Sequence, residues 1–350
     1  MPTAVDNASD TIQPSSSSPH TIYRQDVINC SFSSWYKEFR NVTFRSKIYA
    51  LPPTFIDYLN ADNIYLPDDG QPRTADEDAT EFSDEDDEDD EGDINKKPNF
   101  PEIEQFIRDS IRQLGGAVIP KLNWSSPKDA AWISATQSLK CTSPFDVFLL
   151  LKSSDFINHD LNFAFEHCSE QEPIAFDLIL REWRDLQPSM EFRVFVKDRA
   201  IIGISQRDPT YYEFMNDVKE DIEDMIYDFF EDVVRDKFPS QNYAFDVYVD
   251  RDRCKVWLMD FNPFSPATDA LLYTWEELRQ FGDDSEAEIR IVETQTANSA
   301  PRFATNMVPK DVVDLSDGRT VAEFAEEFQR AMALAGQSDS DSDDDTDDHR

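Results

Sequence analysis

Glycine is scarce in this chain, with only 8 Gly among 350 residues. Neither the P-loop pattern GxxxxGK[ST] nor the dinucleotide-binding pattern GxGxxG occurs. Both patterns need glycine because the backbone must approach phosphate groups closely. Their absence excludes a P-loop nucleotide site and argues against a dinucleotide-binding fold. Any phosphate that the protein binds must therefore be neutralised by other means.

Cysteine and histidine are also rare, and neither forms a metal-binding pattern. The sequence contains no CxxC pair, which argues against a zinc site and against a disulfide framework. The four histidines include no HExxH motif, so we expect no histidine-based catalytic centre. We expect free thiols in a reducing compartment, and the four cysteines are Cys30, Cys141, Cys168 and Cys254.

Long apolar runs and an excess of basic residues are both missing. No stretch reaches the length of about 18 apolar residues typical of a membrane span, and the polar N-terminus has no apolar signal region. The formal net charge is −39 at pH 7. An acidic surface repels nucleic acid, whose binding needs clustered Lys and Arg. We therefore expect a cytoplasmic monomer that binds a basic protein surface, with no direct nucleic-acid or membrane partner.

Much of the negative charge is concentrated in two short segments. Residues 76–93 hold 13 acids and residues 337–350 hold 7, although the rest of the chain is still acidic. Such segments contain too few apolar groups to offset the entropy of ordering the chain. We therefore predict a disordered leader at 1–24, a folded body at 25–290 with a disordered acidic insertion at 67–98, a C-terminal extension at 291–336 and a disordered acidic tail at 337–350.

The folded body mixes helical and strand patterns, which predicts an α+β fold. Apolar residues at helical spacing predict helices over 101–114, 218–238, 274–281 and, in the extension, 319–335. Alternating or continuous apolar runs predict strands over 117–121, 145–151, 174–180, 191–196 and 200–206, and a hairpin over 246–264.

The hairpin DVYVDRDRCKVWLMDFNPF places carboxylates at unusual positions. A turn near residues 251–253 would bring Asp246 opposite the stretch around Asp260. Like charges across a strand pair destabilise it, so we expect a positive group between them. Together with Asn262, the two acids supply the hard oxygen ligands that Mg²⁺ prefers. A solvated hairpin edge with acids facing water is an equally simple interpretation. Strict alternation would place four residues of the second strand on one face: Val256, Leu258, Asp260 and Asn262.

Three further residues are candidates for a phosphate or nucleotide site. Lys121 ends the strand at 117–121 and precedes small hydroxyl residues, so an ammonium and backbone donors could meet a phosphate there. A surface lysine at a strand end is the simpler interpretation. Glu191 and Arg193 share one face of a strand, where they would suit a ribose and a phosphate. They could equally form a cross-strand ion pair.

Seven sequence blocks resemble the cell division cycle protein 123 family, in the order in which that family has them. The resemblance covers roughly residues 25–290 and implies an ATP-grasp-like fold, in which two subdomains clamp ATP and Mg²⁺. It also implies a role in assembling eukaryotic translation initiation factor 2 through the C-terminal domain of its gamma subunit, and hence in translation initiation and cell-cycle progression. The blocks are PKLNWSSPKDAAWI (120–133), LLLKSSDFI (149–157), LILREW (178–183), EFRVFV (191–196), GISQRD (203–208), DFNPF (260–264) and TWEEL (274–278).

The resemblance also implies roles for individual residues. It implies phosphate binding by Lys121, a hinge against adenine at Arg181, Glu182 and Trp183, ribose binding by Glu191, nucleotide binding by Arg193, and metal binding by Asp246, Asp260 and Asn262. Because no glycine-rich phosphate loop is evident, we expect an ATP-binding chaperone and assign no catalytic residue. Two alternatives are an ATP-grasp carboxylate–amine ligase and an acidic scaffold that binds its partner without nucleotide.

Overall fold

The computed structural model describes residues 22–61, 66–67, 99–166, 168, 172, 174–281 and 287–294. The predicted leader, acidic insertion, C-terminal extension and acidic tail lie almost entirely outside the described residues, as does the helix predicted at 319–335. Within the described part, no helix is both long and apolar enough to cross a membrane.

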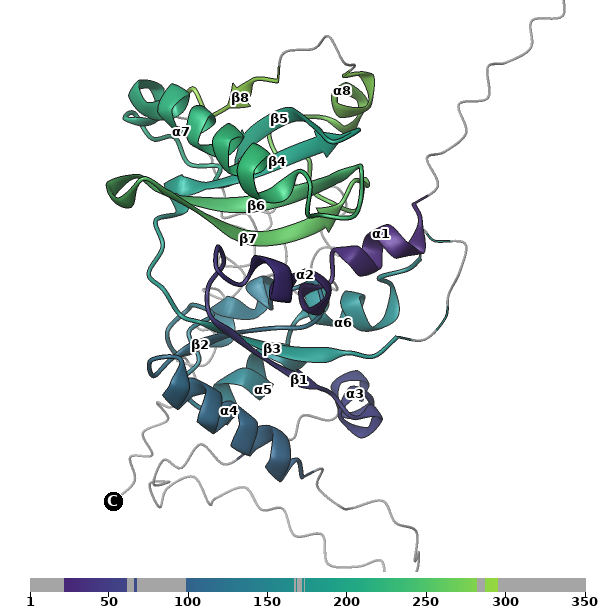
Figure 1. Ribbon diagram of the computed structural model, residues 1–350. Coiled ribbons are helices and arrows are strands. Elements are labelled where there is room, and N and C mark those ends of the chain that lie inside the picture. Colours follow the sequence, from purple (N-terminus) through teal and green to yellow (C-terminus); the bar gives the residue numbers. More distant parts are fainter. Residues whose placement is uncertain are drawn as a thin grey trace, which may run out of the picture. The chain divides into compact units, whose positions relative to one another are not determined.

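Two separate β-sheets form the framework of the described chain (Figure 1). The smaller sheet has the order β1-β3-β2, with both pairs antiparallel, and consists of β1 (Ser46–Ala50), β3 (Asp177–Glu182) and β2 (Val118–Lys121). The larger sheet has the order β7-β6-β4-β5-β8, in which the β5–β8 pair is parallel and the other pairs are antiparallel. Its strands are β4 (Glu191–Lys197), β5 (Ala200–Gln206), β6 (Tyr243–Asp250), β7 (Lys255–Pro263) and β8 (Ile289–Arg290).

Helices cover both sheets, which confirms the α+β prediction. Those packed around the smaller sheet include α3 (Pro53–Asn60), α4 (Pro101–Gln113), α5 (Pro144–Lys152) and α6 (Asp155–Asn162). One face of the larger sheet packs against α7 (Met215–Phe229), which continues as a π-helix over Phe230–Val234, and against α2 (Phe32–Phe39), which follows α1 (Arg24–Asn29). The other face packs against α8 (Trp275–Gln280). Short 3-10 helices lie at Lys128–Ile133, Pro188–Met190 and Arg251–Arg253.

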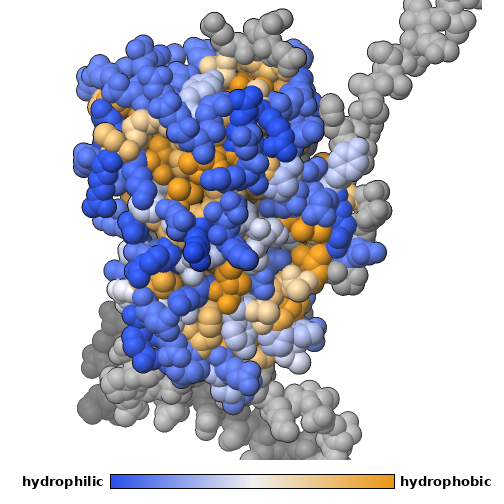
Figure 2. All heavy atoms as spheres, viewed as in Figure 1, coloured by the Kyte–Doolittle hydropathy of each residue, from blue (hydrophilic) through white to orange (hydrophobic). Residues whose placement is uncertain are grey.

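Figure 2 shows the same side of the molecule with polar residues over most of the surface, interrupted by apolar residues over both sheets. Most large apolar side chains lie instead in the buried cores that pack against the two sheets.

One predicted strand is wrong, because residues 145–151 lie in the helix α5. A short continuous apolar run does not distinguish a buried strand from a buried helix. Hydrogen bonds at the start of the segment favour the helix. The Ser143 hydroxyl accepts a hydrogen bond from the Asp146 amide, and the Asp146 carboxylate accepts one from the Ser143 amide. This capping box, with Pro144 in the first turn, initiates a helix. The other predicted helices and strands of the described part are confirmed, with shifted ends.

Gly203 in β5 lies directly against the ring of Tyr273. A Cβ atom at this position would lie 2.7 Å from Tyr273 Cζ. Tyr273 cannot move freely, because it is buried, its hydroxyl donates to the Glu288 carbonyl, and the Arg290 guanidinium lies 3.8 Å from its ring centroid. We expect Gly203→Ala to lower the free energy of unfolding by about 1–3 kcal/mol, the usual cost of overpacking. Chemical denaturation of the two proteins measures this difference.

A second background identifies the cause of that destabilisation. In a Tyr273→Leu protein, the smaller side chain leaves room for the new methyl group, so the Gly203 substitution should cost much less. An equal cost in both backgrounds would show that the Tyr273 ring is not responsible.

Candidate functional site

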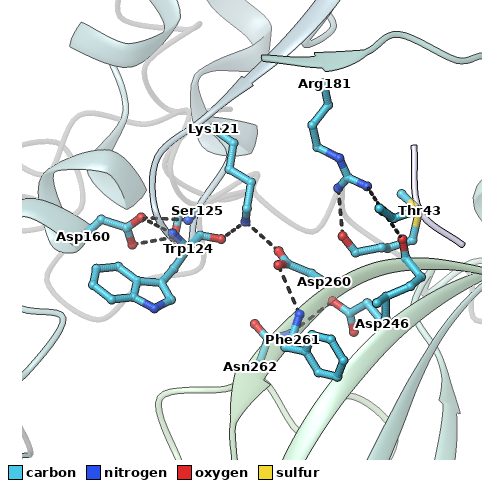
Figure 3. A network of polar contacts seen from close by, with 12 residues as sticks. Thr43, Lys121, Trp124, Ser125, Asp160, Arg181, Asp246, Asp260, Phe261 and Asn262 are labelled. Atoms are coloured by element: carbon cyan, nitrogen blue, oxygen red, sulfur yellow. Dashed lines mark hydrogen bonds and ion pairs between the residues drawn. The ribbon is translucent and has the colours of Figure 1, made fainter. Parts of the chain in front are cut away.

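The two sheets meet where a lysine of the smaller sheet pairs with an aspartate of the larger one. Lys121, the last residue of β2, lies with its Nζ 2.6 Å from Oδ2 of Asp260 in β7 (Figure 3). The same ammonium donates to the Trp124 carbonyl. Lys121 is only 1% exposed, so the interpretation of a surface lysine is wrong. A buried lysine needs such partners, because an unpaired buried charge destabilises the fold by about 3–5 kcal/mol.

The loop after Lys121 is held in place by a buried carboxylate. Asp160 accepts hydrogen bonds from the Trp124 amide at 3.3 Å, the Ser125 amide at 2.7 Å and the Ser125 hydroxyl at 2.7 Å. Burial raises the pKa of Asp160, and these hydrogen bonds oppose that shift. The loop conformation therefore keeps the Trp124 carbonyl within reach of the lysine.

Asp246 is placed opposite Asp260 in the ladder, as the sequence predicts. It is only 3% exposed, so it does not face water at a hairpin edge. Arg193 binds both of its oxygens, with Nε 2.8 Å from Oδ1 and Nη2 2.9 Å from Oδ2. Burial alone would raise the pKa of Asp246, but the Arg193 and Arg207 guanidinium groups outweigh it and hold the pKa well below its usual range. The expected positive group is thus present as basic side chains.

A β-bulge sets the direction of Asp260. Asp246 pairs with Asp260, but the next pair of the ladder uses Leu258, so Met259 is an extra residue in β7. The extra residue shifts the alternation by one. Consequently Phe261, and not Asp260, lies with Leu258 in the core. The prediction that one face of this strand carries all four alternating residues is therefore wrong.

Glu191 and Arg193 do not pair with each other. Glu191 accepts a hydrogen bond from Arg207 Nη1 at 2.8 Å, whereas Arg193 binds Asp246 and donates to the Asp269 carbonyl at 2.8 Å. Arg207 also lies 3.6 Å from Asp246 Oδ2. The alternative of a simple cross-strand ion pair between Glu191 and Arg193 is therefore wrong, and both residues join one charged network.

Lys128, in the 3-10 helix after the loop, also contributes to this network. The nearby Arg207 guanidinium, together with partial desolvation, lowers the pKa of Lys128 to about 8, against the opposing effect of neighbouring acids. Its side chain is nevertheless exposed to solvent. We call the whole set the charged corner. It contains one more base than acid, which favours an anionic ligand, and its members are Lys121, Lys128, Glu191, Arg193, Arg207, Asp246 and Asp260.

The three predicted hinge residues have polar partners outside the charged corner. Glu182 pairs with Arg45 at 2.6 Å and with Arg184 at 3.3 Å. The Trp183 amide donates to the carbonyl of Ala117, the residue that precedes β2. Arg181 directs its guanidinium at the backbone of β7. Their contacts with ATP stay predictions.

The metal set Asp246, Asp260 and Asn262 also stays a prediction, and its chemistry fits Mg²⁺. All three offer hard oxygens, and Asn262 Nδ2 lies 3.4 Å from Asp246 Oδ2, which brings the amide beside the carboxylate. Within the described ranges, no three His, Cys, Asp or Glu side chains group closely enough to hold a metal alone. The set would therefore rely on Asn262 and on phosphate or water oxygens. Lys121 would have to release Asp260, and Arg193 would have to share Asp246 with the cation.

Two members of the charged corner were missed from the sequence, Lys128 and Arg207. Both lie inside blocks quoted for the family resemblance, PKLNWSSPKDAAWI and GISQRD. Each follows a predicted strand closely, which is the available signal. Nothing in the linear sequence places either residue beside Asp246.

Comparisons with known proteins agree with this architecture. A translation initiation factor eIF2 assembly protein of Schizosaccharomyces pombe is 41% identical over 320 residues, covering 87% of this chain and 96% of that protein. The protein of the same name from Xenopus tropicalis is 40% identical over 316 residues, covering 84% and 93%. The solved structure of Cdc123 from Schizosaccharomyces pombe has a TM-score of 0.66 and 39% identity, covering 79% of this chain and all of that one. The D123 family profile matches residues 35–316, so the family resemblance is confirmed and the chain belongs to the D123 family.

Proposed function

We propose that this protein is an ATP- and Mg²⁺-binding chaperone for the assembly of eukaryotic translation initiation factor 2. Its support from relatives is the shared name of the proteins from Schizosaccharomyces pombe and Xenopus tropicalis, eIF2 assembly protein. Its support from structure is one observation above all: the buried Lys121 reaches across from one sheet to Asp260 of the other. At such a junction, the lysine of the smaller sheet could bind a polyphosphate, and the acids of the larger sheet could bind the divalent ion that accompanies it.

The charged corner supplies a consistent set of roles. Lys121, Lys128 and Arg207 would bind phosphate oxygens, because cationic donors form the strongest hydrogen bonds to phosphate. Arg193, in the same network, would bind the nucleotide, and Glu191 would bind the ribose. Mg²⁺, held by Asp260, Asn262 and Asp246, would neutralise charge on the triphosphate.

Adenine would lie against the end of β3, at Arg181, Glu182 and Trp183. The family resemblance of the sequence blocks implies a hinge against adenine at these three residues. The backbone of this segment is fixed on both sides, because the Glu182 amide donates to the Arg45 carbonyl at 2.8 Å and the Trp183 amide donates to the Ala117 carbonyl at 3.1 Å. A fixed backbone is suited to recognising a base edge.

Nucleotide would act on the partner by linkage. The described body consists of two sheets whose junction includes polar contacts such as the Lys121–Asp260 pair. A ligand that binds both sheets favours whichever arrangement it binds best, and it strengthens partner binding only if the partner prefers that arrangement. The proposed partner is the C-terminal domain of the gamma subunit in the cytoplasm, with a basic surface that complements the net charge of −39.

A reconstitution experiment tests this function. The full chain is mixed with purified gamma subunit with ATP and Mg²⁺, with ATP and EDTA, or without nucleotide, and binding and the joining of gamma to the alpha subunit are measured. The proposal requires both to be strongest with ATP and Mg²⁺. Binding that is identical in all three mixtures would identify an acidic scaffold, and release of ADP and phosphate in proportion to an added amine acceptor would identify a ligase.

The affinity for ATP should fall with rising pH through Lys128. Arg207 is the main cause that lowers the pKa of Lys128 to about 8, and a bound phosphate would raise that pKa again. Below this pH the lysine is already protonated, whereas above it binding must take up a proton. Linkage then predicts a loss of about tenfold in affinity between pH 8 and pH 9.5, measurable by calorimetry.

Two substitutions at the same position isolate this effect. Lys128→Arg stays charged and should bind ATP with a nearly flat pH profile over this range. Lys128→Met should bind weakly at all pH values, while Lys140→Met at an exposed site should behave as the wild type. A wild-type profile shared by the Lys128→Arg protein would assign the pH dependence to another group.

A further inference from the structure

Met259, the bulged residue of β7, has no partner residue in β6. The register shifts between Asp246 and Val247, so the bulged residue is skipped in the β6–β7 ladder. A bulge leaves local backbone groups without ladder partners, and those groups need other donors. The residue that follows the bulge is Asp260, so any motion of the bulge redirects the carboxylate.

Arg181 of the smaller sheet and the segment before β1 supply the missing contacts. Arg181 in β3 donates from Nη1 to the Met259 carbonyl at 2.8 Å and from Nη2 to the Thr43 hydroxyl at 3.2 Å (Figure 3). The Thr43 hydroxyl in turn donates to the Leu258 carbonyl at 2.7 Å. The Leu258 amide donates to the Val42 carbonyl at 2.8 Å. Two successive carbonyls of β7 are thus held from outside the larger sheet.

The Arg181 side chain is buried, and this burial disfavours its charged form. It is 7% exposed, and burial lowers its pKa even though Asp260 opposes the shift. Its guanidinium carbon lies 5.4 Å from the Phe32 ring centroid and 5.7 Å from that of Phe44. Among the residues that the structure describes, it forms no ion pair with a carboxylate. The hydrogen bonds of this guanidinium therefore go to a backbone carbonyl of β7 and to a hydroxyl that itself binds β7.

We propose that Arg181 is a positioning residue that fixes the Met259 bulge, and with it the direction of Asp260, from the opposite sheet. This inference rests on the proposed function, because it concerns the cation that accompanies ATP. It assigns the Arg181 side chain to the metal-dependent part of ATP binding, so that contact with adenine at this position would come from the backbone. Partners of metal ligands typically contribute about 10–100-fold to metal affinity.

The test separates metal-dependent from metal-independent binding. ATP is titrated into the full chain in EDTA and in Mg²⁺, and the ratio of the two affinities is the metal gain. Arg181→Met should reduce the metal gain by about tenfold or more and change the affinity in EDTA by less than about twofold. The electron paramagnetic resonance spectrum of bound Mn²⁺ should broaden or shift in the same variant, because the Asp260 carboxylate is no longer held in place.

Matched variants keep the test decisive. Thr43→Val leaves Arg181 intact but removes the hydroxyl between it and Leu258, so it should also reduce the metal gain, and Thr43→Ser should restore it. Arg184→Met is the control, because Arg184 ends the same segment and packs on Phe44 and Trp257 without contacting β7 carbonyls. If Arg181→Met does not fold, the two Thr43 variants decide the question.

Each outcome has one meaning. An unchanged metal gain in Arg181→Met or in Thr43→Val overturns the positioning role. An equal loss of affinity in EDTA and in Mg²⁺ overturns it in favour of direct nucleotide contact by Arg181. If the wild type itself shows no metal gain or no ATP binding, it is the proposed function that fails, which this design distinguishes because the wild type is measured first.

Discussion

An Asp260→Asn protein is expected to lose most of its affinity for ATP in Mg²⁺, while its affinity in EDTA stays equal or rises. The Asp260 side chain is 20% exposed and lies between Lys121 and the Asp246–Asn262 pair, where it would supply a direct metal ligand. Because even outer partners of a metal contribute about 10–100-fold, we expect a loss of about 100-fold. In EDTA, removal of one negative charge beside the phosphates favours binding.

The substitution keeps the size of the side chain, so packing changes little. Asp250→Asn is the matched control, since Asp250 lies in the same hairpin, opposite Lys255 and 3.6 Å from Arg253. Calorimetric titration of both variants in Mg²⁺ and in EDTA provides the measurement. An Asp260→Asn protein that retains the full gain from Mg²⁺ would remove this residue from the metal set.

A Lys121→Met protein is expected to lose about 100-fold in ATP affinity both in Mg²⁺ and in EDTA, since a charge-assisted contact to phosphate contributes in either condition. The same protein should bind Mn²⁺ more tightly than the wild type when nucleotide is absent. The reason is that Lys121 Nζ lies 2.6 Å from Asp260 Oδ2 and so competes with a cation for that carboxylate. The two effects have opposite signs, and loss of folding cannot produce both.

Lys140→Met is the control for Lys121→Met, because Lys140 is exposed and follows the same loop region. Equilibrium dialysis gives the Mn²⁺ affinity, and a fluorescent ATP analogue gives the nucleotide affinity. Wild-type nucleotide binding by Lys121→Met would mean that the buried lysine only joins the two sheets.

The central features of the site could be predicted from local pattern. Alternation in 243–250 and a charged turn at 251–253 place Asp246 opposite Asp260, and the structure has this register. The strand ending in Lys121 is present, with its lysine buried at the junction of the sheets. These features could be predicted because they depend on residues within one strand or one hairpin. There the alternation of side chains between the two faces of a strand can be read from the sequence.

Features that depend on distant contacts were not predictable. The Met259 bulge is held by Thr43 and Arg181, which lie far away in the chain, so the alternation of β7 alone predicted the wrong face for Asp260. Arg207 meets Asp246 because β4 lies between β5 and β6 in the larger sheet, and that strand order is not written in any single segment. The strand predicted at 145–151 failed for a local reason, the capping box at Ser143.

The proposed function requires that the charged corner bind Mg²⁺ and a nucleoside triphosphate together. The most direct measurement is a crystal structure of the full chain with a non-hydrolysable ATP analogue and Mg²⁺. We predict that the cation contacts Asp260 and Asn262, and that Lys121 Nζ leaves Asp260 for a phosphate oxygen. A structure in which the nucleotide binds elsewhere, or in which the Lys121–Asp260 pair persists at its present 2.6 Å beside an unliganded corner, would contradict the account.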